Sequence, residues 1–159
     1  MTKMKLIPFR NCRRALVVAA LLLLTTLLMA DSAKPSFAGH WELDKAKSDF
    51  GKAPAPDSIV ETIDHKEPVL VITTVMKTAR GEQNRTVKLT TDDVENSNLL
   101  SGHAVKTRTH WDGNKLVTIV KDPRGLQITE IRELSKDGRS QTVDIDSGFA
   151  KQKFVMVKK

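Results

Sequence analysis

The chain has 159 residues with one cysteine and no tyrosine, and its 26 Lys and Arg outnumber its 19 Asp and Glu to give a formal net charge of +7. Such an excess would ordinarily suggest a nucleic acid or an anionic membrane as partner. The excess is concentrated in the first thirty residues, which hold five basic side chains and no acidic one. The remainder has 21 basic and 19 acidic residues, about +2, so nucleic acid is not an expected partner.

Residues 1–30 have the pattern of an export signal. A basic stretch ends at Arg14, and the mostly apolar run from Ala15 to Ala30 follows without a charged residue. A helix needs roughly twenty residues to cross a bilayer core, and this run has about sixteen. The pattern therefore predicts a signal helix that is cleaved near Ala30 or Ala33, and an exported protein, periplasmic or secreted. An uncleaved anchor is the alternative, and it would be the only expected contact with a membrane.

The part that remains after cleavage has the size of one domain. Its length, about 125 to 130 residues, is enough to bury a core without covalent crosslinks. The single cysteine, Cys12, lies in the signal, so we expect no disulfide and no cysteine metal site in the mature chain. Residues 31–57 are predicted to form the first strand and an extended lead-in, in which Asp44 caps a short turn and Phe50 anchors the segment to the core.

Residues 58–159 alternate short runs rich in β-branched residues with strong turn signals, and they are predicted to form the remainder of the domain. Sequences such as Asp112-Gly113 and Asp137-Gly138 favour tight hairpins, because glycine supplies the positive φ of short turns. Each predicted strand should therefore pair with the next, and residues 97–102 are interpreted as a loop. The predicted strands are Ile59–His65, Val69–Thr78, Arg85–Thr91, His103–Trp111, Lys115–Lys121, Leu126–Leu134, Arg139–Asp146 and Gln152–Val157.

These hairpins predict an all-β domain. Eight or nine strands without a long amphipathic helix must either stack as a sandwich or close on themselves, and closure removes the exposed edges that invite aggregation. We therefore expect a single antiparallel up-and-down β-barrel of about 8 strands. A flat or sandwiched sheet is the alternative.

Short motifs near both ends of the mature chain resemble lipocalins. Residues 37–41 (FAGHW) are similar to their Gly-x-Trp opening, and residues 44–51 (DKAKSDFG) resemble a segment of small exported bacterial lipocalin-like proteins. Residues 132–138 (RELSKDG) resemble the late arginine strand and its hairpin. The resemblance implies an eight-stranded lipocalin or calycin-type barrel. It also implies that Gly39 and Trp41 form a structural motif at one end, with Arg132 lying across the Trp41 ring in a cation–π contact.

Strand alternation predicts which side chains face the barrel interior, since residues two apart share a face. In the strand Leu126–Leu134, one such face carries Glu130 and Arg132 among apolar residues. Other faces carry further polar side chains among apolar ones: Arg85 with Val87 and Leu89, Thr107 and Thr109 with Val105 and Trp111, and Gln141 with Val143 and Ile145.

These polar side chains need an explanation, because a buried charge costs several kcal/mol unless it is paired or solvated. The functional interpretation is a wet cavity that binds a small amphiphilic or anionic ligand, with Arg85 or Arg132 as the counter-charge. The candidate ligand-binding residues are Arg85, Thr107, Thr109, Glu130, Arg132 and Gln141. The alternative is a bulge that shifts the register, or a position at a solvated rim.

No arrangement typical of catalysis occurs in the sequence. There is no Gly-x-Ser-x-Gly elbow and no glycine loop for phosphate, and Glu61 or Glu130 beside Asp64 are interpreted as ordinary surface acids. We therefore expect no enzymatic activity, no cofactor and no metal. The histidines, which fit no metal-ligand spacing, are His40, His65, His103 and His110.

Three classes of function are compared on this basis. A carrier or sensor of a small amphiphile fits a barrel with a polar interior, whereas an envelope structural or protein-interaction module fits the same barrel with a filled core. An enzyme fits least. A hollow lumen would favour the first class, and a lumen packed solid would favour the second.

Overall fold

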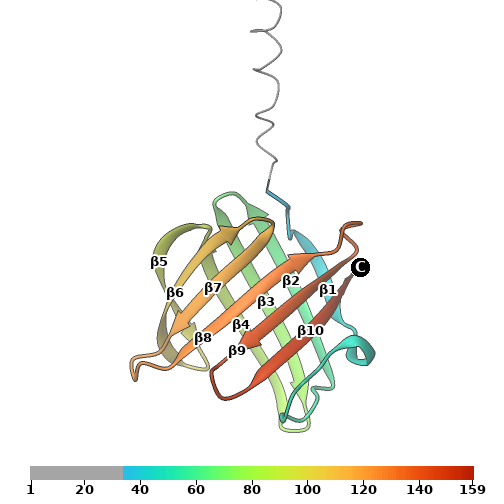
Figure 1. Ribbon diagram of the computed structural model, residues 1–159. Coiled ribbons are helices and arrows are strands. Elements are labelled where there is room, and N and C mark those ends of the chain that lie inside the picture. The colour runs from blue at the N-terminus through green and yellow to red at the C-terminus, as the bar shows by residue number, and fades with distance from the viewer. Residues whose placement is uncertain (1–33) are drawn as a thin grey trace, which may run out of the picture. The chain divides into compact units, whose positions relative to one another are not determined.

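The computed structural model describes residues 34–159, so the predicted signal helix and its cleavage region lie outside the described residues. The described part folds into ten strands and one short 3₁₀ turn (Figure 1). Between residues 34 and 159, no helix is long and apolar enough to cross a membrane. The elements are β1 (Gly39–Leu43), η2 (Lys45–Lys47), β2 (Ser58–Lys66), β3 (Val69–Thr78), β4 (Gly81–Thr90), β5 (Asp92–Leu100), β6 (His103–Asp112), β7 (Lys115–Lys121), β8 (Gln127–Leu134), β9 (Ser140–Asp146) and β10 (Lys151–Lys158).

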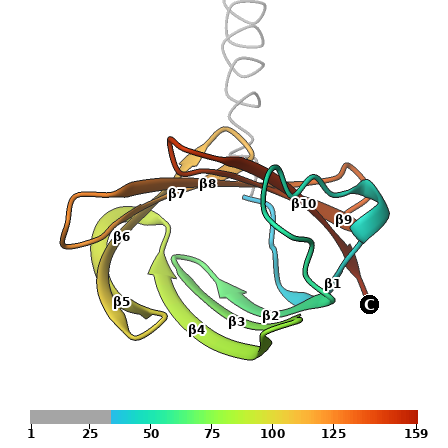
Figure 2. The same ribbon diagram turned by 90° about the horizontal axis from the view of Figure 1, so that it is seen from below.

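All ten strands belong to one antiparallel sheet, in the order β4-β3-β2-β1-β10-β9-β8-β7-β6-β5. Seen from below, the sheet curls round until β4 and β5 approach each other (Figure 2). The predicted all-β, antiparallel, up-and-down architecture is confirmed. The predicted number of about 8 strands is wrong, because the structure has ten.

The strand β5 occupies residues that the sequence predicts in part as a loop. Its sequence, DDVENSNLL, is polar, and its pairing with β6 shifts register between Asp92 and Glu95, where Asp93 has a φ of 62°. A bulge of this kind interrupts the alternation by which strands are recognised. The neighbouring strand β4 also starts at Gly81, four residues before the predicted start at Arg85.

The barrel is not fully closed, because β4 and β5 do not form a backbone ladder with each other. The side-chain amide of Asn98 on β5 takes the place of a peptide group there. Its Oδ1 accepts from the Lys88 N–H and its Nδ2 donates to the Lys88 carbonyl, both at 2.9 Å. Asn96 Nδ2 also donates to Thr90 Oγ1 at 2.9 Å. These side chains bind some of the hydrogen-bonding groups along the edge of β4 that a backbone ladder would otherwise pair.

One end of the barrel, here called the closed end, is filled by Phe37, Trp41, His65 and Trp111. The Phe37 and Trp111 rings stack with centroids 6.0 Å apart, and Trp41 Nε1 donates to the Phe37 carbonyl at 2.8 Å. His65 Nδ1 accepts from the Phe37 N–H at 3.1 Å, and Glu67 accepts from both His65 Nε2 and Trp111 Nε1. Phe37 and Trp41 are fully buried, so the segment that precedes β1 seals this end.

Gly39 and Trp41 lie at the closed end, but the predicted contact between Trp41 and Arg132 is wrong. The cation over the Trp41 ring is Lys158 of β10, whose Nζ lies 5.3 Å from the ring centroid. Trp41 and Lys158 are cross-strand partners, so their side chains share a face. Gly39 has a φ of 139°, a conformation that other residues rarely adopt, which accounts for glycine at this point of the motif.

The lead-in after β1 follows the predicted course. Asp44 caps η2, with its Oδ1 accepting from the Lys47 N–H at 3.3 Å. Phe50 lies against Phe154 of β10 at a centroid distance of 5.8 Å. The segment therefore packs along the β10 side of the barrel.

Candidate functional site

The half of the barrel away from the closed end is hollow. Its main cavity, here called the large chamber, has a volume of about 520 Å³. The chamber reaches solvent beside Gln83, Asn84, Arg85 and Ser101, all of which are exposed. Its apolar wall consists of Ile59, Met76, Val143, Ile145, Phe154 and Met156, and its other polar lining residues are Glu61, Thr74, Glu130, Arg132 and Gln152.

A second cavity of about 140 Å³, the small chamber, adjoins the large one. The two chambers share Arg85, Glu130, Arg132 and Ile145, here called the junction residues. The remaining wall of the small chamber is mostly aliphatic, with Leu89 and Leu100 near the contact between β4 and β5. Arg85, Glu130 and Arg132 therefore lie where the two chambers meet.

Arg132 of β8 is the centre of an ion cluster inside the barrel. Its Nη1 and Nη2 donate to Glu61 Oε2 and Oε1 at 2.7 and 3.1 Å, and its Nε donates to Glu130 Oε1 at 2.6 Å. Arg132 and Glu61 are 2% and 4% exposed, so both charges of this pair are removed from water. Because β2 and β8 are not neighbours in the sheet, the pair links opposite walls of the barrel.

The electrostatics of the cluster follow from this geometry. Burial alone would raise the pKa of Glu61, but the guanidinium of Arg132, helped by Arg85 and by the Thr74 hydroxyl, holds that pKa below its usual value. Burial would likewise lower the pKa of Arg132, but Glu130 and Glu61 together raise it. Glu61 and Arg132 therefore stay ionised. By formal charge, the guanidinium of Arg132 and the two carboxylates of Glu61 and Glu130 sum to −1.

We predict that Glu61 makes the free energy of unfolding fall at acidic pH. Its folded-state pKa is lower than its unfolded-state value, so its contribution is complete above about pH 5 and is lost as the pH falls through the folded-state pKa. Urea unfolding of wild type and Glu61→Gln between pH 7 and pH 3 measures this. The wild type should lose more unfolding free energy on acidification than Glu61→Gln does, whereas Glu133→Gln, an exposed control, should follow the wild type. Equal slopes in wild type and Glu61→Gln would contradict the prediction.

The structure brings four of the six predicted ligand-binding residues to the cavities. Arg85, Glu130 and Arg132 are junction residues, and Thr107 lines the small chamber, where its Oγ1 accepts from Asn98 Nδ2 at 2.9 Å. Thr109 is fully buried and bonds to Thr118 Oγ1 at 3.0 Å without lining either chamber.

Gln141 also lies away from the chambers. Its Oε1 accepts from Arg132 Nη1 at 3.4 Å, and its Nε2 is buried without a hydrogen-bond partner among the described residues. It does not line either chamber, so a ligand in the lumen would meet Arg132 and Glu130 before this amide.

Sequence reasoning missed Glu61 and Thr74. The interpretation of Glu61 as a surface acid is wrong, since it is buried between Ile59 and Ile63 on the inner face of β2. That alternation was visible in the sequence and could have identified Glu61 as an interior charge. Thr74 lies opposite Glu61 in the register of β2 and β3, and its Oγ1 donates to Glu61 Oε1 at 3.5 Å.

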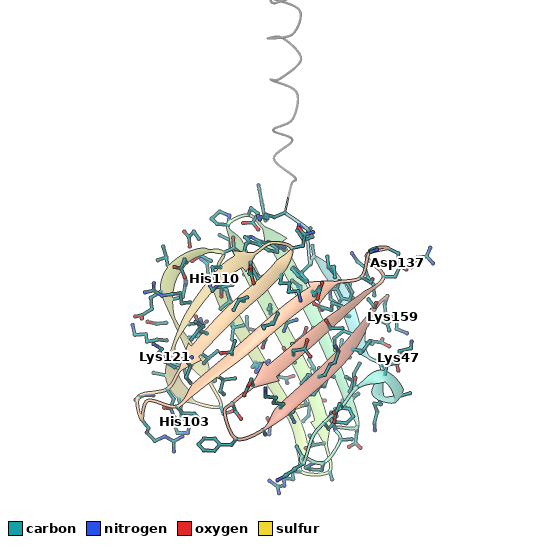
Figure 3. All side chains as sticks on the ribbon, viewed as in Figure 1. Lys47, His103, His110, Lys121, Asp137 and Lys159 are labelled. Carbon is teal, nitrogen blue, oxygen red and sulfur yellow. The ribbon has the colours of Figure 1, made fainter. Side chains whose placement is uncertain are left out.

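The histidines do not converge. His103 and His110 lie at opposite ends of β6 (Figure 3), and within residues 34–159 no three His, Cys, Asp or Glu side chains are grouped as metal ligands would be. His65 is part of the closed end.

Comparisons with known proteins agree with this architecture. No protein-family model and no curated protein sequence matches the chain. Among solved structures, the fluorescent protein UnaG is similar, with a TM-score of 0.63 and 19% identity over 77% of this chain and 97% of that one. Two single-residue variants of UnaG give TM-scores of 0.60 and 0.62 at 20% and 21% identity, again over 77% of this chain and over 96% and 95% of theirs.

These matches show that the fold of this chain, an antiparallel and nearly closed β-barrel, is similar to the fold of UnaG. The expectation of an antiparallel barrel, which the lipocalin resemblance implied, is supported, although the barrel has ten strands where eight were implied. At these identities the likeness concerns the fold, so the chemistry of the lumen must be argued from the residues of this chain.

Proposed function

We propose that the protein is an exported binding protein that carries or senses a small amphiphilic molecule in the large chamber. The observation that supports this most is the chamber itself. Its volume of about 520 Å³ lies within the usual range for small-molecule sites, and its lining combines an apolar wall with polar side chains, as an amphiphilic ligand requires. The proposal is for binding rather than catalysis, without a cofactor.

The alternative function, an envelope structural or interaction module, expects a solidly packed lumen. The closed end is packed in this way, around Phe37, Trp41 and Leu70. The other half leaves space for a ligand beside exposed residues of β4, and this difference between the two halves favours a binding protein.

An anionic group on the ligand would find its counter-charge at Arg85 rather than at Arg132. Arg132 already donates to two carboxylates, whereas Arg85 has no carboxylate within salt-bridge distance in the described part of the chain. Arg85 is exposed and lines both chambers, so it can reach a ligand without first breaking an ion pair.

We expect the neutral fluorescent probe N-phenyl-1-naphthylamine to bind the wild type, and Met76→Trp to weaken this binding about tenfold or more. Met76 lines the large chamber, and an indole there would occupy the space that the probe needs. Val94→Trp is the matched control, since Val94 is 56% exposed and lines neither chamber. Fluorescence titration measures the affinity, and circular dichroism checks that each variant is folded.

Two outcomes would overturn the proposed function: a wild type that does not bind the probe, or equal binding by wild type and Met76→Trp. Native mass spectrometry of protein purified from its own cell envelope is a second test, because bound mass would reveal the ligand class directly. Recovery of the protein in the envelope fraction would also support export.

A further inference from the structure

We propose, building on the proposed function, that the junction between the chambers binds a protonated amine, with Glu130 as its acceptor. The ligand would then be an amphiphile whose positively charged head lies inside the barrel, between Glu130 and the apolar wall. This assigns the head group by its charge and leaves the shape of the apolar part open.

The hydrogen bonds of Arg132 are nearly all taken by the protein. Four of the five N–H groups of an arginine donate here, one through Nε to Glu130, two through Nη1 to Glu61 and Gln141, and one through Nη2 to Glu61. A ligand anion could therefore bind Arg132 strongly only by displacing a carboxylate from it. Such a displacement would leave a carboxylate without its partner, at a cost that rises with burial.

Glu130, in contrast to Arg132, uses only one of its two carboxylate oxygens in hydrogen bonds among the described residues. One of its oxygens, Oε1, accepts from Arg132, while no donor lies within hydrogen-bond distance of Oε2 among residues 34–159. The Glu130 side chain is 17% exposed and lines both chambers, so this oxygen belongs to a group that a ligand can reach. An ammonium group has three donors and the charge that complements this acceptor.

The charge of the junction also favours a cation over an anion. Arg132, Glu61 and Glu130 together carry one net negative charge, and a charge in the half-buried junction is screened less than one at the surface. Arg85 is also a junction residue and its charge acts on Glu61, but its side chain is exposed, so water screens its repulsion of a cation more than it screens the buried carboxylate of Glu61. An ammonium group at Glu130 would neutralise the cluster, whereas a carboxylate there would meet two others.

The test compares three ligands with the same twelve-carbon chain, dodecylamine, dodecanol and dodecanoate, as competitors of N-phenyl-1-naphthylamine below their micellar concentrations. For the wild type, dodecylamine should compete at a concentration about tenfold or more below that of dodecanoate, since hydrogen bonds to charged groups typically contribute this much. In Glu130→Gln this preference should fall to about threefold or less. The matched control Glu133→Gln lies on the same strand and faces outward to Lys115, so it should keep the preference.

Each outcome separates this proposal from the proposed function. Tighter binding of dodecanoate than of dodecylamine, lost in Arg85→Gln, would overturn the amine and support an anionic ligand at Arg85. An amine preference that is unchanged in Glu130→Gln would overturn the role of Glu130. If the probe itself does not bind the wild type, the proposed function fails first, and the amine proposal fails with it.

Discussion

Replacing Arg132 by leucine is expected to lower the free energy of unfolding by about 3–5 kcal/mol at neutral pH. The leucine leaves the Glu61 carboxylate, 4% exposed, without the guanidinium that now binds both of its oxygens. Thr74 donates a single long hydrogen bond and cannot replace that charge. The loss therefore comes from an uncompensated buried charge rather than from a missing contact.

Urea unfolding at pH 7 measures this loss, and a double variant shows its cause. Removing both charges, in Arg132→Leu with Glu61→Leu, should recover most of the lost stability, because replacing a buried ion pair by apolar residues is often close to neutral. Glu130 keeps partial access to solvent in both variants. A double variant as unstable as Arg132→Leu alone would show that the buried charge of Glu61 is not the cause.

Replacing Phe37 by alanine should cost about 3–5 kcal/mol, the usual range for a buried phenylalanine. Phe37 is fully buried, and its ring stacks on Trp111 and packs beside His65. The hydrogen bonds of its main chain to Trp41 and His65 use backbone atoms, which the alanine retains, so the expected loss is that of the ring.

Phe149 provides a control of the same residue type. It is 87% exposed in the connection between β9 and β10, so Phe149→Ala should change the free energy of unfolding by no more than about 0.5 kcal/mol. Denaturant titration of both variants makes the comparison. Similar stabilities for Phe37→Ala and Phe149→Ala would mean that the segment before β1 does not seal the barrel.

The sequence predicted most strands because their turns have distinct chemistry. The hairpin at Asp112-Gly113 joins β6 to β7, and the one at Asp137-Gly138 joins β8 to β9, both where glycine has a positive φ. β5 was harder to predict, because its Asn96 and Asn98 side chains hydrogen-bond to β4 in positions where an ordinary strand has apolar residues. A strand with polar side chains on its inner face lacks the alternation of apolar and polar residues by which strands are recognised.

The candidate site was predictable in position but not in pairing. Alternation along β8 correctly placed Glu130 and Arg132 on the inner face. It could not show that Glu61, 71 residues earlier in the chain, would meet Arg132 across the lumen. The contact between Trp41 and Arg132, which the lipocalin resemblance implied, is wrong because the register of β1 with β10 places Lys158 beside Trp41.

The position of β10 in the sheet has a consequence for the order of folding. The strands β1 to β4 and β5 to β10 form two series of hairpins between neighbours in sequence, and the two series join by ladder hydrogen bonds only where β10 meets β1 (Figure 1). During synthesis β10 emerges last of the described strands, so each series can begin to form early while their union waits for it. Because contacts between distant segments form slowly, we expect this union to limit the folding rate.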